Sequence, residues 1–154
     1  TNFQQYFKLV EYFSEFTKER MGLAMGVYNL IQIFDEKYYR NLSGGILEAF
    51  GKLFYRDLKV YMYPYHDQET GEYINSENLK VPPRMKELYK FFNNNGKLVN
   101  IDDFDAEILD IFSRTVLKMI VKGDDGWEQM LPKGIAETIK AKKLFGYSKS
   151  KAKR

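Results

Sequence analysis

The chain has 154 residues, with 24 Lys and Arg against 21 Asp and Glu, and this length is enough for one folded domain with a buried core. Hydrophobic residues make up 44% of the sequence and aromatic residues 16%, a composition typical of a globular protein and not of a disordered one. The absence of cysteine excludes disulfides, thiolate metal sites and a cysteine nucleophile. A single histidine excludes a multi-histidine zinc site within one chain.

The net charge of +3 is concentrated at the end of the chain. The last seven residues contain no acidic side chain and four basic ones, Lys149, Lys151, Lys153 and Arg154. Removing these four from the 24 basic residues leaves 20 against 21 acidic ones, a net charge of −1. We therefore expect a nearly neutral globular domain over residues 1–147 and a basic, disordered tail over residues 148–154.

No apolar stretch approaches the roughly 20 residues that a helix needs to cross a bilayer, and no signal peptide is recognisable. We expect a cytoplasmic protein with no cofactor, no metal and no membrane partner, in which nucleic acid would contact only the basic tail. The chain starts at Thr1 and enters a helical pattern at once, which suggests a piece of a longer protein.

The first predicted elements are an amphipathic helix, a strand and a second helix. Over residues 3–17, aromatic side chains that include Phe7 and Phe13 recur at helical spacing, with charged residues on the other side. Residues 21–39 could form one helix, but each of its two glycines would cost a helix interior about 1 kcal/mol relative to Ala. We therefore prefer a short strand over 21–25, followed by a helix over 27–39.

A pair of glycines then precedes a predicted helix over residues 46–54. Ser43 is expected to cap this helix through its hydroxyl, while Gly44 and Gly45 keep the backbone open. Free N–H groups at the positive end of a helix dipole, with Arg40 close by, indicate a candidate phosphate site. The alternative is that these residues form only a cap and a hinge.

The clearest strand covers residues 58–63, where apolar and polar side chains alternate. His66 and Asp67 come just after its carboxyl end, where α/β folds place ligand sites, and histidine transfers protons near neutral pH. We therefore include this pair in the candidate ligand site. A lone histidine in a surface loop without a chemical role is the alternative.

The remaining pattern predicts helices over 82–94, 106–122 and 134–144, and a short strand over 97–101. Alternation of strands and helices favours a helix-rich α/β fold, with three or four short strands and helices packed around them. An all-helical domain with a small sheet is the alternative.

Three passages together resemble a known family: FDEKYYRNLSGGILEAFGKLF (34–54), LKVYMYPY (58–65) and GWEQMLPKGIAETIKAKKLFGY (126–147). They are similar to the C-terminal third of long bacterial proteins often labelled nicotinate- or nicotinamide-nucleotide adenylyltransferases, and the resemblance covers most of residues 3–147. That family acts through H-x-G-H and S-x-T-x-x-R motifs, and neither occurs here, so the resemblance implies no catalytic residue in this chain. It implies a terminal domain of a larger protein.

Two functions follow as hypotheses. The first is a non-catalytic module for oligomerisation or docking, with itself or with other domains of the parent protein as partner. Aromatic residues are enriched at interfaces, and we expect the contacts at Phe7, Phe13, Trp127, Phe145 and Tyr147. The alternative is a nucleotide- or phosphate-binding domain that uses Arg40, Ser43, Gly44, Gly45, His66 and Asp67.

Overall fold

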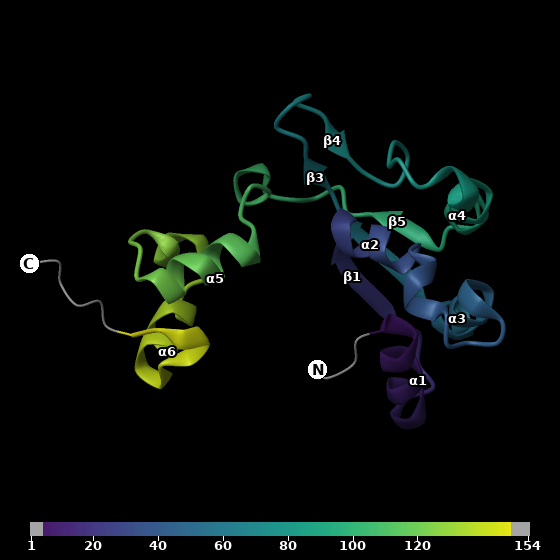
Figure 1. Cartoon of the computed structure of the whole chain (residues 1–154), viewed down its shortest axis with the longest axis horizontal. Coiled ribbons are helices and arrows are strands. Elements are labelled where there is room, and N and C mark those ends of the chain that lie inside the picture. Colours follow the sequence, from purple (N-terminus) through teal and green to yellow (C-terminus); the bar gives the residue numbers. More distant parts are fainter. Residues whose placement is uncertain (1–4, 149–154) are drawn as a thin grey trace, which may run out of the picture. The chain divides into compact units, whose positions relative to one another are not determined.

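The computed structural model describes residues 5–148, which form a helix-rich α/β structure with six α-helices and two small sheets (Figure 1). The predicted fold class is therefore confirmed. The chain packs as two compact units, one ending at Phe104 and the other beginning at Asp105, and each is described by itself. The single globular domain expected over residues 1–147 stays a prediction. Apart from Ser148, the predicted basic tail lies outside the described residues.

Three parallel strands form the main sheet of the first unit, in the order β1–β2–β5. They are β1 (Gly22–Gly26), β2 (Lys59–Tyr63) and β5 (Leu98–Asn100), within two residues of the strands predicted over 21–25, 58–63 and 97–101. The register places Val60 between Leu23 on one side and Leu98 on the other, which makes one apolar row across the sheet. Val60 is fully buried, so this row faces the core.

Four α-helices belong to this unit: α1 (Tyr6–Phe16), α2 (Val27–Ile33), α3 (Gly45–Leu53) and α4 (Lys86–Asn94). Strand β1 passes directly into α2 at Gly26, as the strand–helix interpretation of residues 21–39 predicted. The predicted extension of α2 to Tyr39 is wrong. The helix ends at Ile33, and the Asp35 carboxylate accepts the N–H of Lys37 (3.1 Å), which starts a separate 3₁₀ helix, η1 (Glu36–Tyr39).

A cluster of aromatic rings joins these helices, and Phe50 of α3 lies at its centre. Its ring centroid is 5.0 Å from those of Phe34 and Phe92 and 5.7 Å from that of Phe54, each in an edge-to-face arrangement. Phe34 follows α2 and Phe92 lies in α4, so one ring connects three helices. Edge-to-face pairs of this kind contribute roughly 0.5–1.5 kcal/mol each beyond the area that they bury.

A short antiparallel hairpin follows the central strand, made of β3 (Tyr65–His66) and β4 (Tyr73–Ile74) (Figure 1). The chain then returns through residues 75–82 to the 3₁₀ helix η3 (Pro83–Met85), which leads into α4. The N–H of the buried Ser76 donates to the Asn100 side chain (2.9 Å), and its carbonyl accepts from the Tyr89 hydroxyl (2.7 Å). These bonds tie the connection to both β5 and α4.

The second unit contains α5 (Ser113–Lys122), α6 (Ile135–Lys142) and the 3₁₀ helices η5 (Trp127–Met130) and η6 (Leu144–Gly146). Its buried cluster consists of Val116, Ile120, Trp127, Ala136 and Ile139. The predicted continuous helix over 106–122 is wrong, because the chain forms a 3₁₀ turn at Ala106–Ile108 and starts a new helix after Phe112. Apolar spacing alone does not distinguish one long helix from two successive helical segments.

Replacement of the central ring tests the role of the aromatic cluster. We expect Phe50→Ala to lower the free energy of unfolding by about 3–5 kcal/mol, because a ring that is 1% exposed leaves a cavity among close-packed neighbours. Urea unfolding followed by far-ultraviolet circular dichroism measures this loss. Phe91→Ala removes a ring that is 60% exposed and should change the same free energy by less than about 0.5 kcal/mol. Equal losses in the two variants would contradict the central role of Phe50.

Candidate functional site

A surface pocket of about 680 Å³ opens in the first unit among η1, the start of α3 and η3. Its volume falls within the roughly 300–1,000 Å³ that is usual for small-molecule sites. Three residues of the predicted phosphate site, Arg40, Ser43 and Gly45, line it together. The sequence therefore predicted the residues on one side of the pocket and not those on the opposite side.

The floor of the pocket is apolar and continuous with the core. Its hydrophobic lining residues are Ile31, Phe34, Tyr39, Leu42, Ile46, Pro82 and Met85. The Tyr39 hydroxyl donates to the Ile33 carbonyl (2.8 Å), and burial raises the pKa of Tyr39 to about 12. Because the phenol stays neutral at physiological pH, Tyr39 serves as a fixed wall of the pocket and not as an acid or base.

Charged side chains surround the opening. Lys37 lies 2.6 Å from the Asp35 carboxylate, and Arg84 forms an ion pair with Glu36. The hydrogen bond from Lys37 is the main reason why the pKa of Asp35 is lowered, and the charge of Arg40 contributes to the same shift. Within residues 5–148, the side chain of Arg40 makes no hydrogen bond or ion pair, and it is exposed. It is therefore the cation of this pocket that is available to a ligand.

The start of α3 is capped differently from the prediction. Gly44, not Ser43, is the N-cap residue, and its N–H donates to the Glu48 carboxylate (3.0 Å), which also pairs with Lys52 (3.1 Å). The predicted capping role of Ser43 is wrong because Ser43 precedes the N-cap residue, and a carboxylate from the first turn reaches back to the N–H of that residue instead. The Ser43 hydroxyl, free of the cap, is exposed along the pocket. An anion would therefore be bound by side chains and not by the capped N–H.

The side of the pocket around Arg84 comes from a distant part of the sequence. Pro82 and Pro83 start η3, and the hydrogen bonds of Ser76 to β5 and α4 hold the preceding connection in place. Sequence reasoning missed Arg84, as well as Asp35, Glu36 and Lys37. A basic residue directly after a helix-initiating Pro-Pro pair was the only available signal, and it does not specify which part of the chain lies opposite.

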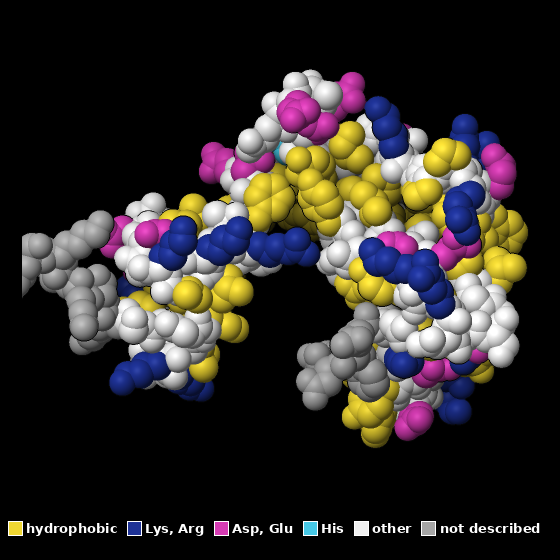
Figure 2. All heavy atoms as spheres, viewed as in Figure 1, with side chains coloured by type: hydrophobic (Ala, Val, Ile, Leu, Met, Phe, Trp, Pro, Cys, Tyr) yellow, Lys and Arg dark blue, Asp and Glu magenta, His cyan; other side chains and the backbone are white. Residues whose placement is uncertain are grey.

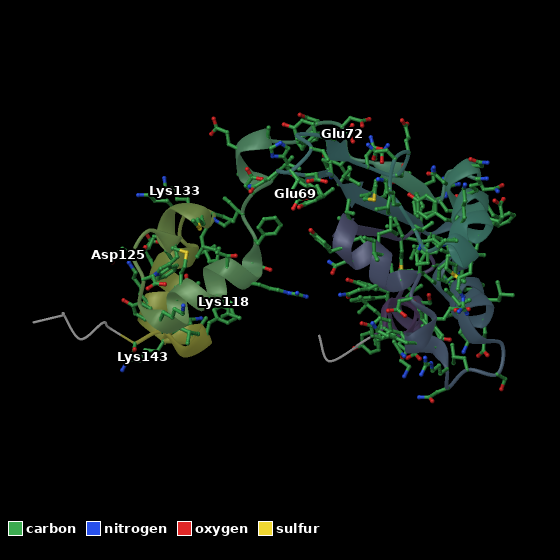
Figure 3. All side chains as sticks on the ribbon, turned by 45° about the horizontal axis from the view of Figure 1, so that its top comes forward. Glu69, Glu72, Lys118, Asp125, Lys133 and Lys143 are labelled. Carbon is green, nitrogen blue, oxygen red and sulfur yellow. The ribbon has the colours of Figure 1, made fainter. Side chains whose placement is uncertain are left out.

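His66 and Asp67 do not line this pocket. They lie on the hairpin, where the His66 ring is 5.1 Å from that of Tyr73. The Asp67 carboxylate accepts the N–H groups of Glu69 (2.9 Å) and Thr70 (3.4 Å), so it stabilises the hairpin turn whose acidic side chains Glu69 and Glu72 are labelled in Figure 3. The residues predicted to form one ligand site thus separate into a pocket group and a hairpin group.

The predicted interface residues fall into a buried group and a group with exposed or half-buried rings. Phe7 and Trp127 are 3% and 2% exposed, because Phe7 belongs to the core of the first unit and Trp127 to that of the second. Burial within their own units leaves neither ring available as a surface anchor. Phe13 and Phe145 are 46% and 59% exposed, and Tyr147 is half-buried against Trp127, with ring centroids 5.9 Å apart.

Comparisons with protein-family models, with curated proteins and with solved structures found no match. The resemblance to the adenylyltransferase-labelled family therefore stays a prediction. In the described part of the chain, no group of three or more His, Asp or Glu residues is placed to hold a metal ion. A search of the same residues found no helix with the length and apolar character needed to cross a membrane.

The cap at the start of α3 should depend on pH. Hydrogen bonds from Gly44 and Lys52 lower the pKa of Glu48 below its ordinary value of 4.5, so its contribution is present at neutral pH and is lost as the pH falls through that lowered pKa. Glu48→Gln should therefore melt at a lower temperature than the wild type at pH 7, and the gap should close in acid. Thermal unfolding of both proteins across this pH range measures it. Glu87→Gln is the control, since within residues 5–148 this carboxylate accepts only from the Lys90 side chain. A gap that stays constant with pH would contradict the cap.

Proposed function

We propose that the first unit binds a small phosphate-bearing molecule with an apolar or aromatic body, such as a nucleotide, within a cytoplasmic bacterial protein. The observation that carries the proposal is the position of Arg40 in a pocket of about 680 Å³ with an apolar floor. The exposed Arg40 guanidinium, which makes no side-chain hydrogen bond or ion pair within residues 5–148, provides a fork of donors that matches a phosphate.

The pocket offers a different chemistry to each end of such a ligand. Arg40 follows η1 and Ser43 directly precedes the N-cap of α3, and both line the pocket, where they would donate to phosphate oxygens. Ile31, Leu42 and Met85 provide apolar surface for the body of the ligand. Asp35 and Glu36 also line the pocket, but each is held by its own cation, which reduces their repulsion of an anion.

The binding proposal predicts stabilisation by nucleotides that depends on Arg40. AMP, ATP and inorganic pyrophosphate would each be added to the protein in a thermal-unfolding assay. A ligand present at 100 times its Kd stabilises the folded state by about 2.7 kcal/mol. We expect at least one nucleotide to raise the unfolding temperature of the wild type and Arg40→Gln to lose most of this rise.

Arg20→Gln is the matched control, because Arg20 is an exposed arginine that does not line the pocket. This variant should keep the full ligand-induced rise. A wild type that responds to none of the three compounds, or an Arg40→Gln variant that responds as the wild type does, would refute the binding proposal. A response to pyrophosphate equal to that to ATP would show that the apolar floor contributes nothing.

A second candidate function is weak self-association through α1, and an exposed aromatic group favours it. Tyr12, Phe13 and Phe16 are 43%, 46% and 70% exposed, and the ring of Tyr12 lies 5.5 Å from that of Phe13 and 5.0 Å from that of Phe16. A second copy of the chain is the proposed partner, since a two-fold axis would bring the same rings together. At about 150–250 Å² for each aromatic side chain, the exposed part of the three is roughly 300 Å². This is well below the ~800 Å² that each partner buries in a stable complex, so the dimer would be weak.

Light scattering over a range of protein concentrations tests this self-association. We expect the average mass of the wild type to rise with concentration, and Phe16→Ser to remain monomeric because the most exposed ring is lost. Phe91→Ser, which removes an exposed ring from α4, should associate as the wild type does. A wild type that stays monomeric at every concentration would exclude α1 as a contact between copies.

A further inference from the structure

Helix α5 of the second unit carries three cations on one face. Arg114, Lys118 and Lys122 are spaced four residues apart, so they follow one another along the helix at intervals of about 6 Å. All three are exposed, and within residues 5–148 none of their side chains makes a hydrogen bond or ion pair. Figure 2 shows Lys and Arg side chains in a row along this helix, and Figure 3 labels Lys118 among them. The row is a continuous strip of unneutralised positive charge.

The acidic residues of this unit all fall outside α5 itself. Three precede α5 in the sequence, two follow its end, one is in η5 and one is on α6: Asp105, Glu107, Asp110, Asp124, Asp125, Glu128 and Glu137. Glu128 is already paired with Lys140 (2.6 Å). Helix α5 itself contains no acidic residue, so its exposed face has no internal counter-charge.

Apolar side chains lie beside the cations on the helix. Leu117 and Val121 of α5 are 44% and 58% exposed. The turn after α6 reaches the same helix, since a Cβ built on Gly146 would lie 3.6 Å from the Val121 side chain. Phe145, the residue before it, is 59% exposed and has a φ of 55°, a left-handed conformation that is unfavourable for phenylalanine. A strained turn that packs against α5 thus carries an exposed aromatic ring.

This surface has the chemistry that binds single-stranded nucleic acid. Such sites combine a positively charged strip for the phosphates with aromatic rings on which bases stack. A helix that lies in a membrane interface instead keeps its largest apolar face for the lipid. In α5 that face is already used, because Val116 and Ile120 are 4% and 3% exposed in the core of the unit. The charge of the strip therefore favours a polyanion that lies along the helix.

We infer that Arg114, Lys118, Lys122 and Phe145 form a docking surface for single-stranded nucleic acid. The cations would neutralise successive phosphates, and the Phe145 ring would stack on a base. The basic residues at the end of the chain would add to the affinity without sequence preference, so the variants that test the surface leave residues 149–154 unchanged.

The test measures binding of a labelled oligothymidylate to the full chain by fluorescence anisotropy at several salt concentrations. For single strands the slope of log K against log salt is about −0.7 for each phosphate neutralised. The double variant Lys118→Gln with Lys122→Gln should weaken binding and make the slope shallower by about 1.4. Lys86→Gln with Lys90→Gln neutralises two exposed lysines at the same spacing on α4 and should change neither quantity.

A second pair of variants tests stacking. Phe145→Ala should weaken binding about 5- to 150-fold without changing the salt slope, whereas Phe91→Ala should have no effect. Emission from the buried Trp127 confirms that the second unit remains folded in each variant. Wild-type affinity and slope in the α5 variant would overturn the inference, because the tail would then account for all binding. Tighter binding to phosphatidylserine vesicles than to the oligonucleotide would overturn it as well.

Discussion

The first unit depends on the packing of the Phe50 ring against rings from neighbouring helices. Phe34 at the end of α2 and Phe92 in α4 meet it edge to face, each with centroids 5.0 Å away, and Phe92 also stacks on Phe54 at 4.3 Å. Protein interiors are close-packed, so a ring held on several sides has one position and transmits any displacement to its neighbours. Phe34 is also part of the floor of the candidate pocket. The aromatic core therefore fixes the geometry of the surface on which Arg40 is placed.

Of the three cations that line that pocket, Lys37 and Arg84 are paired with carboxylates. Arg40 makes no ion pair within residues 5–148. Asp35 and Lys37 are two residues apart and satisfy each other locally, while Glu36 holds Arg84 from a distant segment. Exposed pairs of this kind add little stability, so their main effect here is on the field that a ligand meets. The charges within each of these two ion pairs cancel at the opening of the pocket, so the net positive charge there comes from the guanidinium of Arg40. An anion that binds there avoids displacing either carboxylate.

The sequence was sufficient for the three strands of the main sheet and for one side of the pocket, and the reasons are local. The alternation in residues 58–63 and the two glycines of residues 22–26 are signals that a few neighbouring residues carry alone. The break after Ile33 was not visible, because it depends on the Asp35 carboxylate accepting the backbone N–H of Lys37. Arg84 could not be assigned to the pocket, since long-range hydrogen bonds of Ser76 place its segment. Phe7 and Trp127 were predicted as interface anchors because they are aromatic, and only the tertiary packing shows that both are buried.

The second unit shows why net charge is a poor guide to what a surface binds. Between Asp105 and Ser148 the chain has seven basic and seven acidic residues, so its net charge is zero. Helical periodicity nevertheless gathers Arg114, Lys118 and Lys122 on one face, while the acidic residues fall outside α5. A polyanion responds to the local potential within about 8–10 Å at physiological salt, not to the sum over the unit. The arrangement of charges on the helix, and not their number, therefore determines which partner this surface suits.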